Sequence, residues 1–335
     1  MLLRRNVSLA PYLTMRVDHV ASEFVTIRSI ADLDAARRHC DAPYRILGGG
    51  SNIVPVANVS GTVLHICIEG IEILADDGNA VTVRVGAGEQ WHEFVEWSVD
   101  RDFGGLENLA LIPGTVGAAP MQNIGAYGVE QSRCFLQLEC VNMSTGERLV
   151  VDAPTCRFGY RDSVFKQEWR DVMVITSVTY MLHRQAPLVT DYADVRRAIE
   201  GCMHTPTRRD VFDAVVAIRT AKLPNPAELP NSGSFFKNPI VHTTQAAKLL
   251  SQHPTMPQWP VSDGRVKLAA AWLIDQCGWK GFRNNGVGVH TNQALVIVNA
   301  EGGTGSTVWQ MAADIQRSVA DAFGVELEAE VNRWD

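Results

Sequence analysis

The hydrophobic pattern of the first half of the chain predicts short strands that alternate with helices. The apolar run at 24–27 is typical of a strand, and Ser29 is placed to cap a helix that ends near His39. Alternating valines predict a strand at 80–85, and apolar residues at near-helical spacing predict a helix at 89–99 whose aromatic side chains belong to a core. Further strands are expected at 45–47, 62–68 and 172–182, and a hairpin at 136–142 and 148–151.

Three prolines in the segment 223–233 separate this part from a second group of helices and strands, so we expect a domain boundary there. Strands are expected beyond it at 294–298 and 326–331. Together these elements predict a compact α/β unit after the segment. Helices are expected at about 193–203 and 207–221 before the segment, and at 241–252, 266–277 and 306–323 after it.

Two glycine-rich stretches interrupt the periodic pattern. The first, 104–128, holds six glycines and one charged residue, Glu107. Backbone N–H groups in such a loop can form a concave anion site suited to a diphosphate, and a packed connection with tight turns is the alternative. The second, Gly48-Gly49-Gly50-Ser51-Asn52, predicts a strand that ends in a glycine turn. Neither G-x-G-x-x-G nor G-x-x-x-x-G-K-[ST] occurs, so no Rossmann or P-loop site is expected.

Composition and charge narrow the classes of function. Of the 335 residues, 46% are hydrophobic and 20% charged, which is typical of a globular protein with a sizeable core. The net charge of −7 argues against broad nucleic-acid binding, although a local basic cleft can still bind an anion.

The cysteines and histidines show no metal-site spacing. Seven cysteines lack a C-x-x-C pair and nine histidines lack H-x-x-x-H and H-E-x-x-H, so we expect no metal and reduced, mostly buried thiols. No apolar run reaches transmembrane length and the N-terminus lacks the features of a signal peptide. We therefore expect a cytoplasmic protein without membrane insertion or an obligate protein partner.

Taken together, RILGGGSNIV at 45–54 and ENLALIPGTVGAAPMQNIGAYG at 107–128 resemble the two flavin-binding segments of UDP-N-acetylenolpyruvoylglucosamine reductases of type I. GYRDSVFK at 159–166, SGSFFKNP at 232–239 and the region of Glu330 extend the resemblance over about residues 16–331. The resemblance implies non-covalently bound FAD, held by Gly48, Gly49, Gly50, Ser51, Asn52, Pro113, Gly114, Gly117, Ala118, Ala119, Gln122, Asn123, Gly125, Ala126 and Tyr127.

The same resemblance implies an α+β fold with a vanillyl-alcohol-oxidase-like FAD-binding part. Two FAD-binding subdomains would cover 1–70 and 71–222, and a C-terminal α/β substrate-binding domain would cover 223–324. The C-terminal strand, 325–335, would pack back onto the second subdomain.

The implied reaction is the reduction of UDP-N-acetylglucosamine-enolpyruvate to UDP-N-acetylmuramate, a step of peptidoglycan precursor synthesis, with FAD and NADPH. Reducing an enol ether conjugated to a carboxylate requires a hydride source, positive groups at the carboxylate and a proton donor at the α carbon. No side chain delivers hydride, so a flavin or nicotinamide must. In the family's scheme NADPH reduces FAD and leaves before the UDP-sugar enters the same site.

Three residues match the family's catalytic positions. By spacing alone, Ser234 is a turn serine, Arg161 is a surface arginine beside Asp162 or Glu168, and Glu330 is a solvated carboxylate. The resemblance instead implies that Ser234 is the proton donor and that Arg161 stabilises the enolate-like intermediate. It implies that Glu330 orients the donor or supports the intermediate.

The resemblance also implies a binding site for the UDP-sugar. The chain departs from the family at Trp259, where relatives carry Tyr, and at Asn332, where Arg often follows Glu330 by two positions. Tyr192 lies in a segment that closes over the substrate in the family. Without the resemblance, Lys222 and Arg219 would be interpreted as cations that complement the dipole of a helix at its C-terminus. The substrate-binding residues that the resemblance implies are Tyr160, Tyr192, Lys222, Asn238, Trp259, Lys280 and Gln293.

Two other functions stay open at this point. One is a flavin-dependent oxidase of the same FAD-binding superfamily, which would carry flavin bound covalently through His or Cys. The other is a non-catalytic nucleotide-sugar-binding protein that kept the fold.

Overall fold

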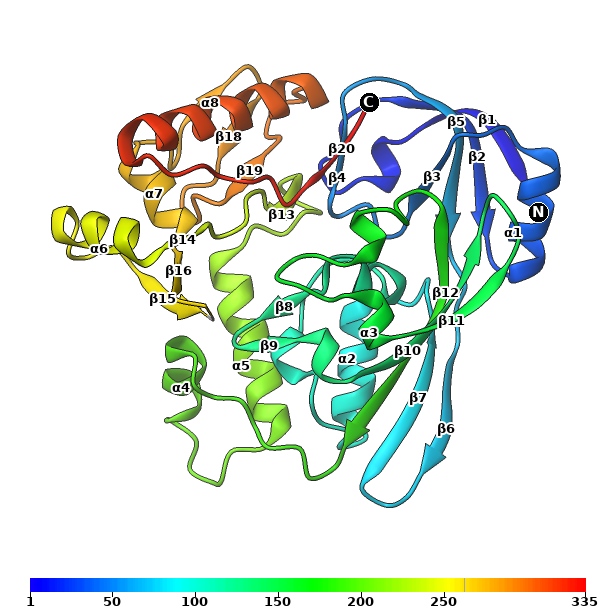
Figure 1. Cartoon of the computed structure of the whole chain (residues 1–335), viewed down its shortest axis with the longest axis horizontal. Helices are drawn as coiled ribbons and strands as arrows, with labels where there is room; N and C mark the ends of the chain where they lie inside the picture. Colours follow the sequence, from blue (N-terminus) through cyan, green and yellow to red (C-terminus); the bar gives the residue numbers. More distant parts are fainter. Residues whose placement is uncertain (262) are drawn as a thin grey trace. The chain divides into compact units, whose positions relative to one another are not determined.

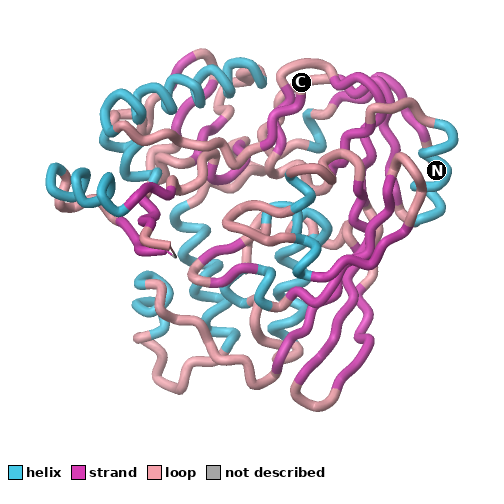
Figure 2. The backbone as a smooth tube through the Cα atoms, in the orientation of Figure 1, coloured by secondary structure: helices cyan, strands magenta, loops and turns pink. Residues whose placement is uncertain are grey.

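The chain folds as two units, each assembled from segments that lie far apart in the sequence. In this computed structural model, residues 1–261 and 263–335 are described. The first unit contains residues 1–7, 21–50 and 59–221, and the second contains 8–20, 51–58 and 222–335. The chain thus enters the second unit for the last time at Lys222, one residue before the proline-rich segment. Figure 1 labels the elements, and Figure 2 shows the loops that join them.

A four-stranded sheet with the order β1-β2-β5-β3 begins the first unit. Strands β2 and β3 both run parallel to β5. Helix α1 (Ile30–His39) joins β2 to β3 and begins as expected, because the hydroxyl of Ser29 accepts a hydrogen bond from the Asp32 amide at 3.2 Å. The strands are β1 (Leu3–Ser8), β2 (Val20–Ile27), β3 (Tyr44–Leu47) and β5 (Val59–Ile66).

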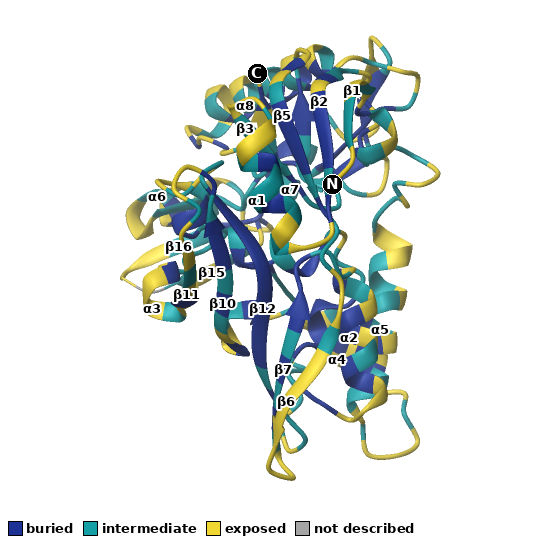
Figure 3. Ribbon diagram, turned by 90° about the vertical axis from the view of Figure 1, so that its right-hand side faces the viewer, coloured by how far each residue is buried: buried dark blue, intermediate teal, exposed yellow. Residues whose placement is uncertain are grey.

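An antiparallel five-stranded sheet with the order β11-β10-β12-β7-β6 forms the main framework of the first unit. The central strand β12 is buried along its length, whereas the edge strand β6 is largely exposed (Figure 3). The expected hairpin of β10 and β11 is confirmed. Strand β6 was not expected, because an exposed edge strand shows no burial pattern. The strands are β6 (Ile71–Asp76), β7 (Ala80–Gly86), β10 (Phe135–Asn142), β11 (Arg148–Asp152) and β12 (Met173–His183).

Helix α2 (Trp91–Asp100) packs its aromatic face on this sheet. The rings of Trp91 and Phe94 lie 6.0 and 5.5 Å from the ring of Tyr180 on β12, which confirms that these aromatics belong to the core. Helix α4 ends earlier than expected and α5 begins one residue later. The remaining helices of this part are α3 (Ala153–Cys156), α4 (Ala193–Ile199) and α5 (Arg208–Lys222).

The second unit contains two further sheets, with the orders β13-β19-β18-β17 and β14-β16-β15. The helix expected at 266–277 is wrong in its first four residues, because Arg265–Leu268 forms strand β16 and the helix α7 begins only at Ala270. The elements are β13 (Asn231–Ser234), β14 (Ile240–His242), α6 (Thr243–Gln252), β15 (Gln258–Val261), β16, α7 (Ala270–Gln276), β17 (Arg283–Asn284), β18 (Val287–Val289), β19 (Val296–Val298) and α8 (Gly305–Phe323).

The C-terminal strand lies later than the sequence predicts. Within the expected strand at 326–331, Ala329 forms only an isolated bridge with Phe236. The strand β20 (Asn332–Trp334) follows and pairs in parallel with β4 (Ile53–Pro55) of the same unit, rather than with the 71–222 region. The ring of Trp334 in β20 is buried. The short sequence VNRWD does not reveal this burial, and so the strand was not expected there.

All seven cysteines are free thiols. Three of them are buried, fewer than expected, and burial raises the pKa of Cys134, Cys140 and Cys156 to about 12 each. Among the described residues, no helix has the length and hydropathy needed to cross a membrane.

The cap of α1 provides a test of the local fold. We expect Ser29→Ala to lower the free energy of unfolding by about 1 kcal/mol, because the Asp32 amide loses its side-chain acceptor. Urea denaturation would measure the change. The control is Ser144→Ala in the β10–β11 turn, a site where the described structure gives the hydroxyl no hydrogen bond. Equal stability of the two variants would contradict the cap.

Candidate active site

The two glycine-rich stretches lie against each other in the first unit. A Cβ atom added at Gly49 would lie 3.0 Å from the Cα of Gly114, and one added at Gly48 would lie 2.7 Å from the Oγ1 of Thr115. Contacts this short leave no room for a side chain. The two segments therefore approach backbone to backbone, as the two predicted flavin-binding stretches should.

We call residues 48–50 and 113–127 the glycine cradle. Its sharp turns pass through Gly50 and Gly114, with φ of 62° and 118°, a left-handed region that favours glycine. After Gly114 the chain forms the short 3₁₀ turns η3 (Val116–Ala118) and η4 (Pro120–Gln122) and the two-residue strand β8 (Gly125–Ala126), which pairs with β9 (Val129–Glu130).

Helix α2 and the residues just before it contact the cradle. The amide of Trp91 donates to the carbonyl of Gly114 at 3.0 Å, and its indole Nε1 donates to the carbonyl of Leu109 at 2.9 Å. A Cβ at Gly117 would lie 2.6 Å from the Cβ of Ala87. The aromatic core of the first unit thus fixes the path of the cradle.

Asn123 holds the cradle in place with its side chain. It is buried, its amide donates to the carboxylate of Glu130 at 2.9 Å and to the carbonyl of Gly159 at 3.1 Å, and its oxygen accepts from Gln131 and from the amide of Ser132. These four bonds engage the side chain within the protein. A contact of Asn123 with a cofactor would therefore come from its main chain.

The chemistry of the cradle fits FAD. None of the residues at 48–50 and 113–127 carries an ionisable carboxylate, and most are Gly, Ala or Pro. A diphosphate can approach the backbone of such a segment without like-charge repulsion or steric obstruction.

Arg161 lies beside the cradle in an unusual backbone conformation. It sits in the turn between Gly159 and Asp162 with φ of 55°, which costs about 1–3 kcal/mol for a residue with a side chain. Its guanidinium donates to the carbonyl of Gly125 and lies 5.3 Å from the ring centroid of Tyr160. The structure therefore brings two predicted site residues, Tyr160 and Arg161, to the cradle.

Arg219 on α5 is a residue whose role the sequence did not reveal. Its Nε donates to the carbonyl of Leu111 at 3.2 Å, and its guanidinium forms a hydrogen bond with the side chain of Tyr127. Leu111 precedes the second cradle segment and Tyr127 ends it, and both have left-handed φ, of 57° and 48°. Burial lowers the pKa of Arg219, and the Tyr127 hydrogen bond opposes that shift.

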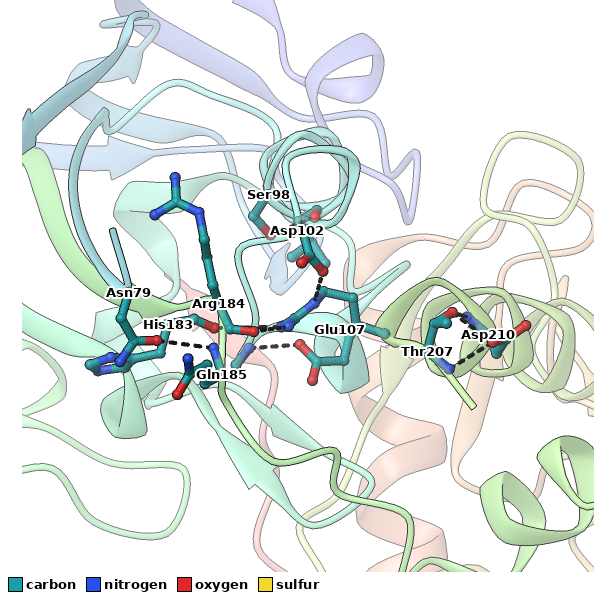
Figure 4. Close-up of polar contacts among 12 residues, drawn as sticks. Asn79, Ser98, Asp102, Glu107, His183, Arg184, Gln185, Thr207 and Asp210 are labelled. Carbon is teal, nitrogen blue, oxygen red and sulfur yellow. Dashed lines mark hydrogen bonds and ion pairs between the residues drawn. The ribbon is translucent and has the colours of Figure 1, made fainter. Parts of the chain in front are cut away.

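Tyr192 contacts the cradle at Tyr127, its last residue. This residue precedes α4, is 42% exposed, and packs its ring edge-on to that of Tyr127 at 5.0 Å between centroids. The buried amide of Asn108 joins the two segments by donating to the carbonyls of Tyr127 at 3.2 Å and Val189 at 2.8 Å. Its neighbour Glu107 accepts from the Gly105 amide at 2.7 Å (Figure 4).

In the second unit, Ser234 and Glu330 lie on neighbouring, hydrogen-bonded segments. The Glu330 amide donates to the carbonyl of Phe235 at 2.8 Å, and the Lys237 amide donates to the carbonyl of Glu328 at 2.9 Å. Ser234 ends β13, where it pairs with Val296 of β19. Two residues nearly a hundred positions apart are thus placed together by main-chain bonds.

Asn332 has a defined role at the position where the family often carries Arg. Its amide and side chain donate to the carbonyl of Asn52 at 2.9 and 3.1 Å, and the Asn52 side chain donates to the carbonyl of Glu330 at 3.2 Å. These bonds fix the main chain of Glu330 beside the turn that contains Ser51 and Asn52, which also belongs to the second unit.

The residues predicted to bind the UDP-sugar are mostly engaged with the protein. Asn238 accepts from the Ala270 amide at 3.0 Å and so starts α7. Lys280 lies 3.4 Å from a carboxylate oxygen of Asp275, and the Gln293 oxygen accepts from the Leu295 amide at 3.4 Å. Trp259 on β15 is 41% exposed, and Lys222 ends α5.

Two family profiles match this chain. The profile described as "FAD binding domain" matches residues 21–152, and the profile described as "UDP-N-acetylenolpyruvoylglucosamine reductase, C-terminal domain" matches residues 225–334. Together with the glycine cradle, they define the chain as a FAD-dependent oxidoreductase. The expected α+β class, with a FAD-binding part before a C-terminal domain, is confirmed.

Curated relatives identify the family. UDP-N-acetylenolpyruvoylglucosamine reductases of Chromobacterium violaceum and Pseudomonas aeruginosa are 47% and 48% identical and cover 98% and 99% of this chain and 97% and 99% of their own. The chain therefore belongs to the UDP-N-acetylenolpyruvoylglucosamine reductase family. The crystal structure of the reductase from Thermus caldophilus shares the fold, with a TM-score of 0.67, 22% identity and full coverage of both chains.

Substituting a cradle glycine tests whether the backbone contact matters for the cofactor. We expect Gly49→Ala to weaken FAD binding at least tenfold, because the new Cβ would separate the two cradle segments. The matched control is Gly201→Ala, where an added Cβ meets nothing within 4 Å. Flavin fluorescence titration of the apoprotein would measure both affinities. Unchanged FAD affinity in Gly49→Ala would contradict the cradle.

Arg219→Lys tests the link between α5 and the ends of the cradle. Losing a charged hydrogen bond costs about 1.5–3 kcal/mol, so we expect FAD affinity and turnover to fall roughly 10- to 100-fold, and Tyr127→Phe to cause a smaller loss. The control is Arg208→Lys on the same helix, whose guanidinium binds Asp102 and the Arg184 carbonyl in the region of Figure 4. That variant should lose stability but keep its FAD affinity. Equal FAD affinities of the two Lys variants would refute the assignment.

Proposed function

We propose that this chain reduces the enolpyruvyl double bond of UDP-N-acetylglucosamine-enolpyruvate with NADPH, and so forms UDP-N-acetylmuramate for peptidoglycan synthesis. The observation that carries the proposal is the match to curated reductases over 98–99% of the chain. The glycine cradle supports it, because its close-packed backbone and its lack of carboxylates suit the diphosphate of FAD.

FAD, when bound, would supply the hydride-transfer chemistry that no side chain provides. We assign FAD binding to the glycine cradle with Ser51 and Asn52. The cradle offers its backbone and small side chains to the diphosphate, while α2 and Arg219 keep its path fixed.

Arg161 is proposed to stabilise the charge that develops on the substrate. When hydride adds at the terminal alkene carbon, the electron pair of the double bond moves to the α carbon and into the carboxylate. A guanidinium stays charged at every accessible pH and can bind a carboxylate through two hydrogen bonds. The hydrogen bond to the Gly125 carbonyl orients the guanidinium, and this use explains why the strained φ of Arg161 is retained.

Ser234 is proposed to deliver the proton. Its O–H bond breaks as a C–H bond forms at the α carbon, and water then reprotonates the alkoxide. A carbanion is a far stronger base than water, so a hydroxyl held close enough is a sufficient acid. The main chain around it is rigid, because Gly233 has φ of 67° and donates to the Asn231 side chain at 2.8 Å. Glu330 is proposed to orient this hydroxyl.

The UDP part of the substrate is assigned to residues that suit a diphosphate and a base. Lys222 and Lys280 carry the positive charge, and the exposed rings of Tyr192 and Trp259 provide apolar faces. Tyr160, Asn238 and Gln293 complete the proposed set.

Separating the two half-reactions tests the role of Ser234. We expect Ser234→Ala to be bleached by NADPH at the wild-type rate under anaerobic conditions, because hydride transfer to FAD needs no proton from Ser234. Adding UDP-N-acetylglucosamine-enolpyruvate should then restore the flavin absorbance at least 10²-fold more slowly than in the wild type. Stopped-flow absorbance would measure both steps.

The matched control is Ser232→Ala, two residues earlier on β13. Its buried hydroxyl has no hydrogen-bond partner in the described part of the chain, so its loss should leave both half-reactions nearly unchanged. Reoxidation of Ser234→Ala at the wild-type rate would remove Ser234 from the mechanism. A wild-type protein that is bleached but never restored by the substrate would refute the proposed function itself.

A further inference from the structure

A cluster of three potential metal ligands lies in the connection between α4 and α5, outside the residues assigned to the reductase reaction. Cys202, His204 and Asp210 each contribute one ligand atom, and these atoms all lie within 4.8 Å of one another. His204 Nε2 and Asp210 Oδ1 are 3.8 Å apart. Ligand atoms of a tetrahedral zinc ion, at bond lengths of about 2.0–2.3 Å, are separated by roughly 3.3–3.6 Å. The cluster therefore needs shifts of only about 1 Å to enclose an ion.

The imidazole of His204 is oriented as a ligand requires. Its Nδ1 lies 3.1 Å from the carbonyl oxygen of Thr205. With the proton on Nδ1 donated to that carbonyl, the lone pair on Nε2 faces Asp210. Metal-bound histidines are commonly held by such a hydrogen bond from the second ring nitrogen.

The carboxylate of Asp210 is held in a similar way. Its Oδ2 accepts from the amide and the hydroxyl of Thr207 at 2.7 and 2.6 Å (Figure 4). Oδ1 is thereby directed to His204.

We propose that Cys202, His204 and Asp210 bind zinc(II), with water as the fourth ligand. One sulfur, one nitrogen and one oxygen ligand suit zinc, whereas magnesium and calcium prefer sites made of oxygen alone. The spacing C-x-H-x₅-D belongs to none of the zinc patterns searched in the sequence, which is why no metal was expected. The half-buried thiol and the exposed imidazole give an ion access from solvent.

The ion would link the end of α4 to the start of α5. The Cys202 amide donates to the carbonyl of Ile199, the last residue of α4, at 3.0 Å, and Asp210 is the third residue of α5. Zinc binding should therefore restrain the connection between α4 and α5. Because the ion binds the folded state, it should also raise the melting temperature of the reductase.

Cobalt(II) is the probe for the test, since it replaces zinc and reports thiolate ligation by absorbance. We expect the FAD-loaded protein to bind one equivalent, with a thiolate-to-cobalt band and tetrahedral ligand-field bands at wavelengths longer than the flavin band. Zinc should displace the cobalt and raise the melting temperature. Cys202→Ser and His204→Ala should lose these bands and bind at least tenfold more weakly.

Cys67→Ser is the matched control. Cys67 also lies beside a histidine, 3.4 Å from the Nδ1 of His65, but belongs to no three-ligand group among the residues described. This variant should bind cobalt as the wild type does. An unchanged flavin spectrum in every variant would show that folding is intact. Absence of a thiolate band in the wild type, or its persistence in Cys202→Ser, would overturn the site.

Discussion

The backbone-to-backbone approach of the two glycine-rich stretches is the constraint on which the first unit depends. A separation of 3.0 Å between a hypothetical Cβ at Gly49 and the Cα of Gly114 means that no other residue fits at position 49 without movement of the cradle. The cradle contains only short 3₁₀ turns and one two-residue strand pair, so its own hydrogen bonds are local. Its path depends on α2 beneath it and on side chains that reach it from other elements.

Those side chains bind residues that have strained backbone conformations. Leu111 and Tyr127 both have left-handed φ, and each is bound by a long side chain: Arg219 binds both, and the amide of Asn108 binds the carbonyl of Tyr127. Left-handed residues with side chains persist where the surrounding structure over-determines them. The strain at the cradle is thus offset by buried polar contacts from α5 and from the glycine stretch itself.

The sequence revealed the parts of this arrangement that depend on local signals. Ser29 capped α1 and the turn after Asn142 closed a hairpin, because both signals lie within a few residues of the structure they determine. The glycine stretches were recognised by their motifs. The role of Arg219 could not be predicted from the sequence, because it depends on a contact with Leu111, 108 positions away. Strand β16 was mistaken for the start of a helix, since only its pairing with β14 and β15 distinguishes the two.

The second unit shows how the main chain at the proposed catalytic residues is held where the sequence departs from the family pattern. Ser234 is placed by the pairing of β13 with β19, and Glu330 by main-chain bonds together with the side chains of Asn52 and Asn332. Asn332 contributes to this frame by donating to the Asn52 carbonyl, a contact that a longer arginine side chain would make from a different position. The geometry around Glu330 therefore depends on main-chain bonds and on the side chains of Asn52 and Asn332. We infer that an uncharged Asn at position 332 removes a positive charge near the proposed proton transfer, while its bond to Asn52 helps to hold the main chain of Glu330.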